Sequence, residues 1–255
     1  MNINLNADLG ESFGAYRMGD DAALLAIVGS ANVACGFHGG DPLVMAQTVR
    51  LARAAGASIG AHPSFPDLQG FGRRAMRLGT DELAAVVTYQ VGALMGMAQS
   101  QGARVTHVKP HGAMSNMACE DPAMAATIAG AVRAVDPGLI LLAPALSQLA
   151  QAGRAAGLRV ADEVFADRAY TEEGNLVPRS QPGAVLATSQ ECLAHVLRML
   201  ERGGIVSASG RLLPTAFHSI CVHGDNAHAV ATAGAVRAGV LAAGHRLCSL
   251  PELMG

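Results

Sequence analysis

Short strand-like runs alternate with longer amphipathic stretches along the whole chain. Alternating apolar and polar residues are typical of a strand, whereas apolar residues three or four positions apart are typical of a helix. The strand pattern occurs over residues 2–8, 32–35, 58–62, 104–109, 139–143, 159–164 and 219–223. The stretches between these segments predict helices, so strands and helices alternate from one end of the chain to the other.

Local signals mark where several of the predicted helices begin and end. Asp41 and Asp121 each stand directly before a proline, an arrangement typical of an N-cap followed by the first helical residue. Thr188, with Glu191 three residues later, forms a capping box and predicts a helix that runs to Arg202. Glycines typical of helix ends occur before the next strand at Gly56, Gly102, Gly157 and Gly244.

The number of strand–helix units decides between fold classes. Seven units in 255 residues predict a single domain, residues 1–255, built as a parallel (β/α) barrel, with a doubly wound sheet as the alternative. Residues 203–217 are less regular, and Ser209-Gly210 predicts a small hairpin within them. In either fold, ligands bind at the carboxyl ends of the strands.

The polar residues of the predicted strands are phased toward those ends. Along the first strand Asn2, Asn4, Asn6 and Asp8 share one face, and the apolar residues between them share the other. Because the outer face of a barrel strand packs against helices, we expect the polar face to line the interior or the mouth. The same phasing groups His107, Lys109 and His111; Ser219, Cys221, His223 and Asp225; Ser58, Gly60 and His62; and Glu163 with Asp167.

Composition excludes several classes of protein. With 51% hydrophobic and 15% charged residues, the chain can bury a sizeable core. A net charge of -2 argues against a nucleic-acid partner or an anionic membrane surface. We recognise no signal peptide or membrane span, and the five scattered cysteines show no metal or redox spacing. We therefore expect a cytoplasmic protein with reduced thiols.

One basic residue stands apart from the others. Lys109 is the only lysine among 18 basic residues. An arginine can replace a solvated lysine on a surface, but it cannot supply a compact ammonium whose pKa responds to burial. With histidines two residues away on either side, Lys109 is the best single candidate for chemistry.

Histidines and carboxylates gather in short strings at the predicted strand ends. Five of the nine histidines lie in these strings: His38, His62, His107, His111 and His223. Together with Asp8, they predict a pocket rich in imidazole and carboxylate. Asp8 with two of the histidines is a plausible divalent-metal site. In the alternative without a metal, general acid and base catalysis is carried out by Asp8, Lys109 and a histidine. His107 lies deeper in its strand, where hydrogen bonding inside the barrel is the simpler interpretation.

Arginines offer a means of binding anions. Arg73 and Arg74 follow the third strand in a glycine-flanked loop, and Arg168 and Arg179 lie in the long loop after the sixth. A guanidinium can bind a carboxylate through two parallel hydrogen bonds, and Arg168 is the favoured candidate. The sequence contains no Gly-x-x-x-x-Gly-Lys-[Ser/Thr] phosphate loop, so this chain does not bind ATP by that route.

Seven strings along the chain resemble the family of the 5-oxoprolinase A subunit, also called the LamB/YcsF lactam-utilisation family. They run in family order from residue 4 to residue 226, and the set is specific although each string alone is weak. The strings are residues 4–11 (NLNADLGE), 34–42 (ACGFHGGDP), 60–63 (GAHP), 70–74 (GFGRR), 109–113 (KPHGA), 163–170 (EVFADRAY) and 221–226 (CVHGDN).

The resemblance implies a seven-stranded, distorted (β/α) barrel related to the glycoside hydrolase/deacetylase barrels. It also implies hydrolysis of 5-oxo-L-proline to L-glutamate coupled to cleavage of ATP with Mg²⁺, together with two further subunits, B and C. The residue roles are our own inference: we assign the acid/base or metal-holding role to Asp8, His62 and His223, and to Lys109 the polarisation of the lactam or the stabilisation of an oxyanion. His111 is the expected proton shuttle. Substrate-binding residues are expected to be Glu11, His38, Arg73, Glu163, Asp167, Arg168 and Asp225, with Arg168 on the substrate carboxylate.

Two other functions remain open at this point. The related barrels make a metal-dependent deacetylase of amidated sugars plausible. The chain could also be a non-catalytic subunit that binds lactam for partners that carry out the reaction.

Overall fold

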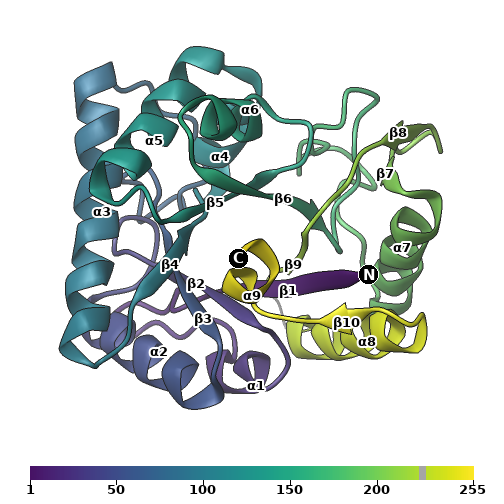
Figure 1. The fold of residues 1–255 in the computed structure, drawn as a ribbon, viewed down its shortest axis with the longest axis horizontal. Helices are drawn as coiled ribbons and strands as arrows, with labels where there is room; N and C mark the ends of the chain where they lie inside the picture. The colour runs from purple at the N-terminus through teal and green to yellow at the C-terminus, as the bar shows by residue number, and fades with distance from the viewer. Residues whose placement is uncertain (224–227) are drawn as a thin grey trace.

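The computed structural model describes residues 1–223 and 228–255. Within these residues, seven parallel strands form a closed barrel in which the first strand pairs with both the second and the last (Figure 1). The barrel strands are β1 (Asn2–Leu9), β2 (Ser30–Ala34), β3 (Ser58–His62), β4 (Val105–Val108), β5 (Ile140–Pro144), β6 (Arg159–Phe165) and β9 (Ser219–Val222). This confirms the predicted barrel and excludes the doubly wound sheet.

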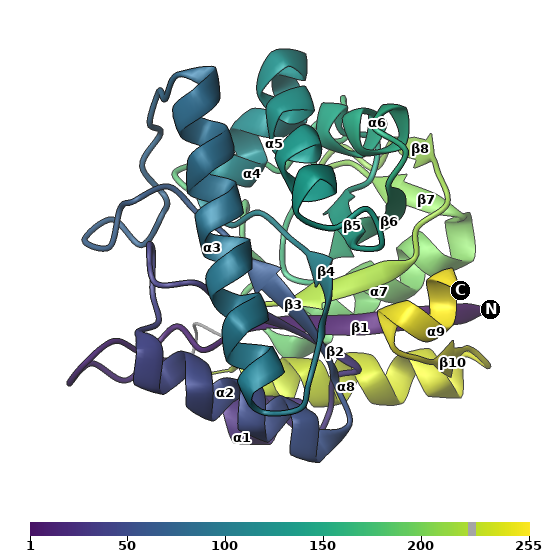
Figure 2. The ribbon, with the colours of Figure 1, turned by 60° about the vertical axis from the view of Figure 1, so that its left-hand side comes forward.

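Helices surround the barrel on its outer side, apart from the last, which lies over the amino end of the barrel. Those of the described residues are α1 (Asp21–Leu25), α2 (Pro42–Ala55), α3 (Thr80–Ser100), α4 (Gly112–Glu120), α5 (Pro122–Val135), α6 (Gln148–Ala155), α7 (Ser189–Arg202), α8 (Ala229–Ala242) and α9 (Leu250–Met254). The longest, α3, packs between α2 and α5 (Figure 2). None of the described helices has the length and apolar character needed to cross a membrane.

The predicted helix boundaries hold because local hydrogen bonds fix them. The carboxylate of Asp41 accepts the backbone N–H groups of Leu43 and Val44 at the start of α2. The Thr188 hydroxyl and the Glu191 carboxylate form the complete capping box at the start of α7. The helix then ends at Arg202, as predicted.

The irregular stretch before the last barrel strand contains the predicted hairpin. Strands β7 (Gly204–Val206) and β8 (Leu212–Pro214) pair in antiparallel fashion, and residues 207–211 form the connection between them. A third short strand, β10 (Arg246–Leu247), pairs with the amino end of β1 outside the barrel closure.

The two faces of the barrel strands differ as the sequence phasing predicts. Ile3 and Leu5 pack into the hydrophobic core between barrel and helices, and Asn4 and Asn6 point the other way, where they hydrogen-bond to other barrel strands. The barrel interior is therefore polar in its middle and toward the carboxyl ends of the strands. At the amino end it is apolar, because Leu250 of α9 packs there with three residues of β5 and β6: Ile140, Leu142 and Ala161. Figure 1 shows α9 lying over this end of the barrel.

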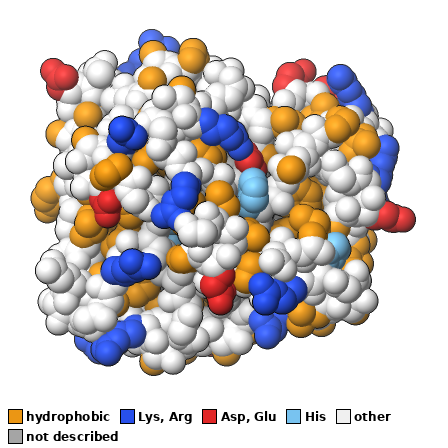
Figure 3. Space-filling model, in the orientation of Figure 1, with side chains coloured by type: hydrophobic (Ala, Val, Ile, Leu, Met, Phe, Trp, Pro, Cys, Tyr) orange, Lys and Arg blue, Asp and Glu red, His pale blue; other side chains and the backbone are white. Residues whose placement is uncertain are grey.

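The outer surface has no block of one charge on the face seen in Figure 3, where acidic and basic side chains are scattered among uncharged ones. The carboxyl ends of the strands lie on another side. There the segment from residue 166 to residue 188, between β6 and α7, extends over the barrel mouth. Isolated bridges from Arg168 to Val185 and from Tyr170 to Leu176 fold this segment back on itself.

Candidate active site

A pocket of about 450 Å³ opens at the carboxyl ends of the strands. Most of the residues selected from the sequence meet here. Those that line it are Asp8, His62, Arg73, Lys109, His111, Arg168 and His223, with Arg179 from the long loop. The pocket is formed jointly by the strand ends and by residues 174–179 of the segment after β6.

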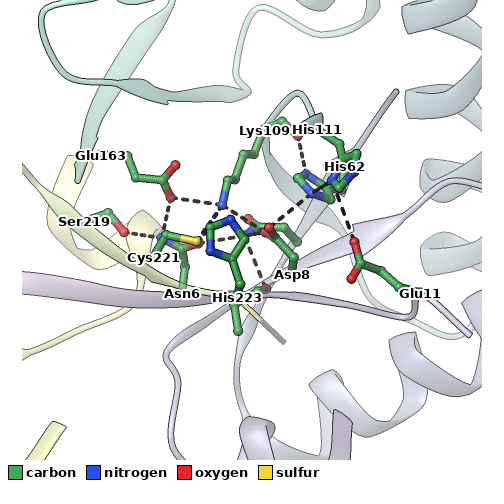
Figure 4. Close-up of polar contacts among 12 residues, drawn as sticks. Asn6, Asp8, Glu11, His62, Lys109, His111, Glu163, Ser219, Cys221 and His223 are labelled. Atoms are coloured by element: carbon green, nitrogen blue, oxygen red, sulfur yellow. Dashed lines mark hydrogen bonds and ion pairs between the residues drawn. The ribbon is translucent and has the colours of Figure 1, made fainter. Parts of the chain in front are cut away.

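Lys109 follows β4 and lies on the floor of this pocket with only 5% of its side chain exposed. Its Nζ lies 2.9 Å from Oδ1 of Asp8 and 3.2 Å from Oε1 of Glu163 (Figure 4). It also donates to Sγ of Cys221 at 2.9 Å. Burial alone would lower the pKa of Lys109, but the adjacent Asp8 carboxylate raises it well above the usual value. Lys109 is therefore an ammonium ion at neutral pH.

Asp8, at the end of β1, is the anionic partner of Lys109. Its Oδ1 also accepts a hydrogen bond from the Asn32 amide at 2.9 Å, and its Oδ2 lies 3.4 Å from Nε2 of His62. Burial opposes ionisation, but His62 and Lys109 together hold the pKa of Asp8 well below its ordinary value. A buried carboxylate that stays ionised beside an imidazole can act as a base.

Glu163, in β6, contacts the same ammonium, but its pKa is shifted in the direction opposite to that of Asp8. Burial raises the pKa of Glu163, and the negative charge on Asp8 adds to this effect. Its Oε1 accepts a hydrogen bond from Asn6 at 2.8 Å, and its Oε2 finds no hydrogen-bond partner among the described residues. Two carboxyl groups with opposed pKa shifts around one cation are typical of sites that perform acid and base chemistry together.

Three histidines and one carboxylate form a second cluster beside Asp8. The rings of His38 and His111 stack with centroids 3.8 Å apart, and both stand edge-on to His62. Nδ1 of His111 lies 2.9 Å from Nε2 of His62, and Nε2 of His38 lies 3.1 Å from Oε1 of Glu11. Burial lowers the pKa values of His38 and His111 well below that of a free imidazole. Both rings are thus neutral at pH 7.

The other wall of the pocket is built by the segment after β6. Asp167 holds the ring of His223 through contacts of 2.8 and 2.9 Å to Nδ1. Although burial works against it, His223 lowers the pKa of Asp167. Arg168 donates from Nε to the carbonyl of Ala184 and from Nη2 to that of Val177, so it ties the segment together at the edge of the pocket.

The arginines after β3 lie in different surroundings. Arg73 lines the pocket, with its guanidinium 5.0 Å from the ring centre of Phe71. Arg74 pairs with Asp67 and braces its own loop. Asp225 falls among residues 224–227, which lie outside the described residues.

Two positions illustrate why glycines stand at the site. A Cβ on Gly60 would lie 2.1 Å from the ring of His107, which fills the barrel interior next to β3. His107 donates from Nε2 to Oδ1 of Asn32 over 3.0 Å, and burial lowers its pKa to about 3. This confirms His107 as an interior hydrogen-bonding group. Gly72, with a φ of +62°, brings the loop backbone close against His38 and His111.

Several polar residues of the site carried no separate prediction. Asn6, Asn32 and Cys221 contact Lys109, Asp8 or both. The alternating pattern placed Asn6 and Cys221 on inward faces, so the strand phasing was the signal that could have identified them. Asn32 stands at the start of its expected strand, where no neighbour indicated its orientation.

Two groups of side chains among residues 1–223 and 228–255 are close enough to hold a metal ion. One consists of Glu11, His38, His62 and His111, and the other of Asp8, Cys221 and His223. The set expected from the sequence, Asp8 with His62 and His223, is divided between these two groups.

Comparison with known proteins agrees with the geometry. The model of the LamB/YcsF family matches residues 3–255. A protein of Azoarcus sp. (strain BH72), named as the A subunit of 5-oxoprolinase, is 61% identical over 253 residues, which cover 99% of each chain. The crystal structure of a lactam utilization protein from Thermus thermophilus matches with a TM-score of 0.91 and 43% identity, over 98% of this chain and all of that one.

A more distant likeness concerns the fold alone. The catalytic domain of a peptidoglycan N-acetylglucosamine deacetylase from Eubacterium rectale aligns with a TM-score of 0.53 and 11% identity, covering 98% of this chain and 88% of that one. The barrel is therefore of the deacetylase-like type, as expected. The family match over nearly the whole chain and the high identity to its members show that this protein belongs to the LamB/YcsF family.

Proposed function

We propose that this chain is the A subunit of a cytoplasmic 5-oxoprolinase and hydrolyses the lactam amide of 5-oxo-L-proline to L-glutamate, with accompanying hydrolysis of ATP. The relatives that are named as the A subunit of 5-oxoprolinase support this assignment. The observation that carries the chemistry is the ion pair between Asp8 and Lys109, buried on the floor of a pocket that His62 and His111 also line.

The residues of the floor suit the two halves of an amide hydrolysis. Water must lose a proton as it adds to the lactam carbonyl, and the ionised Asp8, beside His62, is placed to accept it. The oxygen of the tetrahedral adduct gains negative charge, which the Lys109 ammonium stabilises. When the carbon–nitrogen bond breaks, the ring nitrogen takes up a proton and becomes the amine of glutamate. His111, which lines the same pocket, is the residue we assign to supply that proton.

The basic residues of the rim suit the carboxylate of the substrate. Arg73, Arg168 and Arg179 line the same pocket as the floor residues. Arg168 donates from Nε and Nη2 to backbone carbonyls of its own loop, and Arg73 and Arg179 line the same pocket, where a guanidinium suits a carboxylate. His223, held by Asp167, also lines this pocket.

Coupling to ATP is assigned to the assembly rather than to a phosphate loop in this chain. A five-membered lactam is stabilised by resonance and closes readily, so its opening benefits from an external source of free energy. The chain has no Gly-x-x-x-x-Gly-Lys-[Ser/Thr] string. We therefore assign the use of ATP with Mg²⁺ to the complex with two further subunits, B and C.

The test is reconstitution of the three subunits, with glutamate release and 5-oxoproline-dependent ATP hydrolysis measured together. Asp8→Asn should lower glutamate release at least about 100-fold, as expected for loss of a general base. Asp81→Asn, the same change on the exposed first turn of α3, should leave the rate unchanged. Full activity of Asp8→Asn would show a non-catalytic subunit, and ATP-independent release of acetate from amidated sugars would show a deacetylase.

A further inference from the structure

We propose that Glu11, His38, His62 and His111 form a binding site for a divalent transition-metal cation. The four side chains come from the carboxyl ends of four consecutive strands, β1 to β4. One donor atom from each lies within 4.8 Å of all the others. The site differs from the set of Asp8, His62 and His223 considered from the sequence, and it does not depend on which substrate the pocket accepts.

The first argument is the direction of two ring nitrogens. Nδ1 of His62 lies 2.6 Å from the backbone carbonyl of Lys109, and Nε2 of His111 lies 2.9 Å from that of Phe71. A carbonyl oxygen only accepts hydrogen bonds, so both of these nitrogens carry the ring proton. The remaining nitrogens, Nε2 of His62 and Nδ1 of His111, then face each other with at most one shared proton between them.

These two nitrogens lie 2.9 Å apart. Two ring nitrogens that meet in this way need a positive charge between them, which either a shared proton or a bound cation supplies. Metal-binding histidines in proteins commonly donate their other ring N–H to a backbone carbonyl, which fixes the tautomer and the ring orientation. His62 and His111 both have this arrangement, so the cluster is organised as a pair of ligands would be.

The second argument is the spacing of the donors. The separations are 2.9 Å between the His62 and His111 nitrogens, 3.1 Å between His38 and Glu11, and 3.8 Å between His111 and Glu11. In a tetrahedral site with bonds of roughly 2.0–2.1 Å, donor atoms lie about 3.3 Å apart. These three separations lie on both sides of this value, and every donor atom lies within 4.8 Å of the others.

The third argument is the chemistry of the donors and of their neighbours. Three imidazoles and one carboxylate favour Zn²⁺, Mn²⁺, Fe²⁺ or Co²⁺ over Mg²⁺ and Ca²⁺, which prefer oxygen donors alone. In the other candidate group, Asp8 and Cys221 each lie 2.9 Å from the Lys109 ammonium, which would repel a cation. Among the described residues, the Glu11 cluster is therefore the one suited to a metal.

The cluster is enclosed yet reachable. His38 and His62 are 1% exposed and Glu11 is 6% exposed, so the donors are shielded from bulk water. His62 and His111 nevertheless line the pocket beside Asp8. A bound cation would supply Lewis-acid polarisation at the pocket wall next to the proposed base.

The test uses the purified full chain without a histidine tag, dialysed against a chelator and then titrated with Co²⁺ or Zn²⁺. We expect one equivalent to bind, by elemental analysis and by calorimetry. Co²⁺ should give the visible d–d absorption of nitrogen-rich coordination, and Zn²⁺ should raise the Tm. None of these measurements requires activity or partner subunits, so they stand apart from the test of the proposed function.

Variants identify the ligands. Glu11→Gln and His38→Asn should each weaken binding of the cation more than about tenfold. Changing a residue that only hydrogen-bonds to a metal ligand already costs about tenfold in affinity, and these variants remove a ligand itself. His245→Asn, at the far end of the chain, and Cys221→Ser, in the other group, should bind as the wild type does. Circular dichroism of each variant checks that it folds. If the folded wild type binds neither Co²⁺ nor Zn²⁺, the facing nitrogens of His62 and His111 share only a proton. If Cys221→Ser alone loses binding, the cation lies in the group of Asp8, Cys221 and His223. Either result overturns the proposal.

Discussion

Lys109 owes its properties to three neighbours rather than to its own strand. Asp8, Glu163 and Cys221 surround its ammonium within 3.2 Å, and water barely reaches it. A planar guanidinium is larger and needs a different arrangement of acceptors, which explains why this position carries a lysine in a chain that otherwise uses arginine. The same enclosure makes the ammonium a fixed, poorly solvated charge, which is what stabilisation of an oxyanion requires.

At this scale we predict the effect of removing the charge. Lys109→Met should lower the free energy of unfolding by about 3–5 kcal/mol at pH 7, because it leaves the ionised Asp8 buried without its cation. Urea denaturation followed by circular dichroism measures the change. Arg154→Met is the matched control: Arg154 pairs with Asp162, but half of its side chain is exposed, so its loss should cost about 1 kcal/mol or less. Equal effects of the two variants would contradict the buried ion pair.

The strands position the site: those that contribute to it each bring one or two side chains to the mouth of the barrel. Strands β1 to β4 end beside Asp8, Glu11, His38, His62 and Lys109, and β6 and β9 end beside Glu163 and His223. Their spacing depends on what fills the interior between them. His107 of β4 lies directly over Gly60 of β3, and this contact sets how closely the two strands approach.

We predict that Gly60→Ala destabilises the barrel by about 1–3 kcal/mol, because the added methyl group overlaps the His107 ring and forces it to move. Thermal unfolding measured by calorimetry tests this. Gly96→Ala, in the interior of α3, adds the same methyl group where nothing lies within 4 Å. That variant should be more stable than the wild type by about 0.5–1 kcal/mol, as expected for alanine in place of glycine in a helix. A stabilising Gly60→Ala would show that the ring does not occupy this space.

Across the whole molecule, histidines with lowered pKa values link the stability of the fold to pH. Burial lowers the pKa of His107 to about 3 and that of His195 to about 4, and both lie outside the proposed metal cluster. At pH values between these lowered pKa values and 6.5, the ordinary pKa of histidine, the unfolded chain binds protons that the folded chain does not. Stability must therefore fall as the pH is lowered through this window.

We predict that the free energy of unfolding decreases from pH 6.5 toward pH 4.5 by about 1.4 kcal/mol per pH unit for each such histidine. Urea denaturation at a series of pH values gives the slope. His107→Gln keeps a polar side chain but cannot take up a proton, so its slope should be smaller by the share of one histidine. An unchanged slope in this variant would mean that His107 is protonated in the folded chain.

Much of this architecture was predictable from the chain itself. Strand phasing placed Asn4, Asn6 and Asp8 on the inner face, and the caps at Asp41 and Thr188 fixed the starts of two helices. These features depend on residues close together in the sequence, whose backbone geometry and hydrogen bonds are decided locally. The single lysine also pointed to the pocket floor before any partner was known.

Tertiary structure alone decided which side chains meet. Closure of β1 against β9 places Cys221 against Lys109, over 112 positions of sequence separation. The packing of the loops after the strands brings Glu11 and His38 beside His62 and divides the expected set of Asp8, His62 and His223 between two groups. Arg168 turns most of its guanidinium to carbonyls of its own loop. Local periodicity determined the strands and their inner faces, whereas barrel closure, register and loop packing determined the contacts, because those depend on distances between segments that no short pattern encodes.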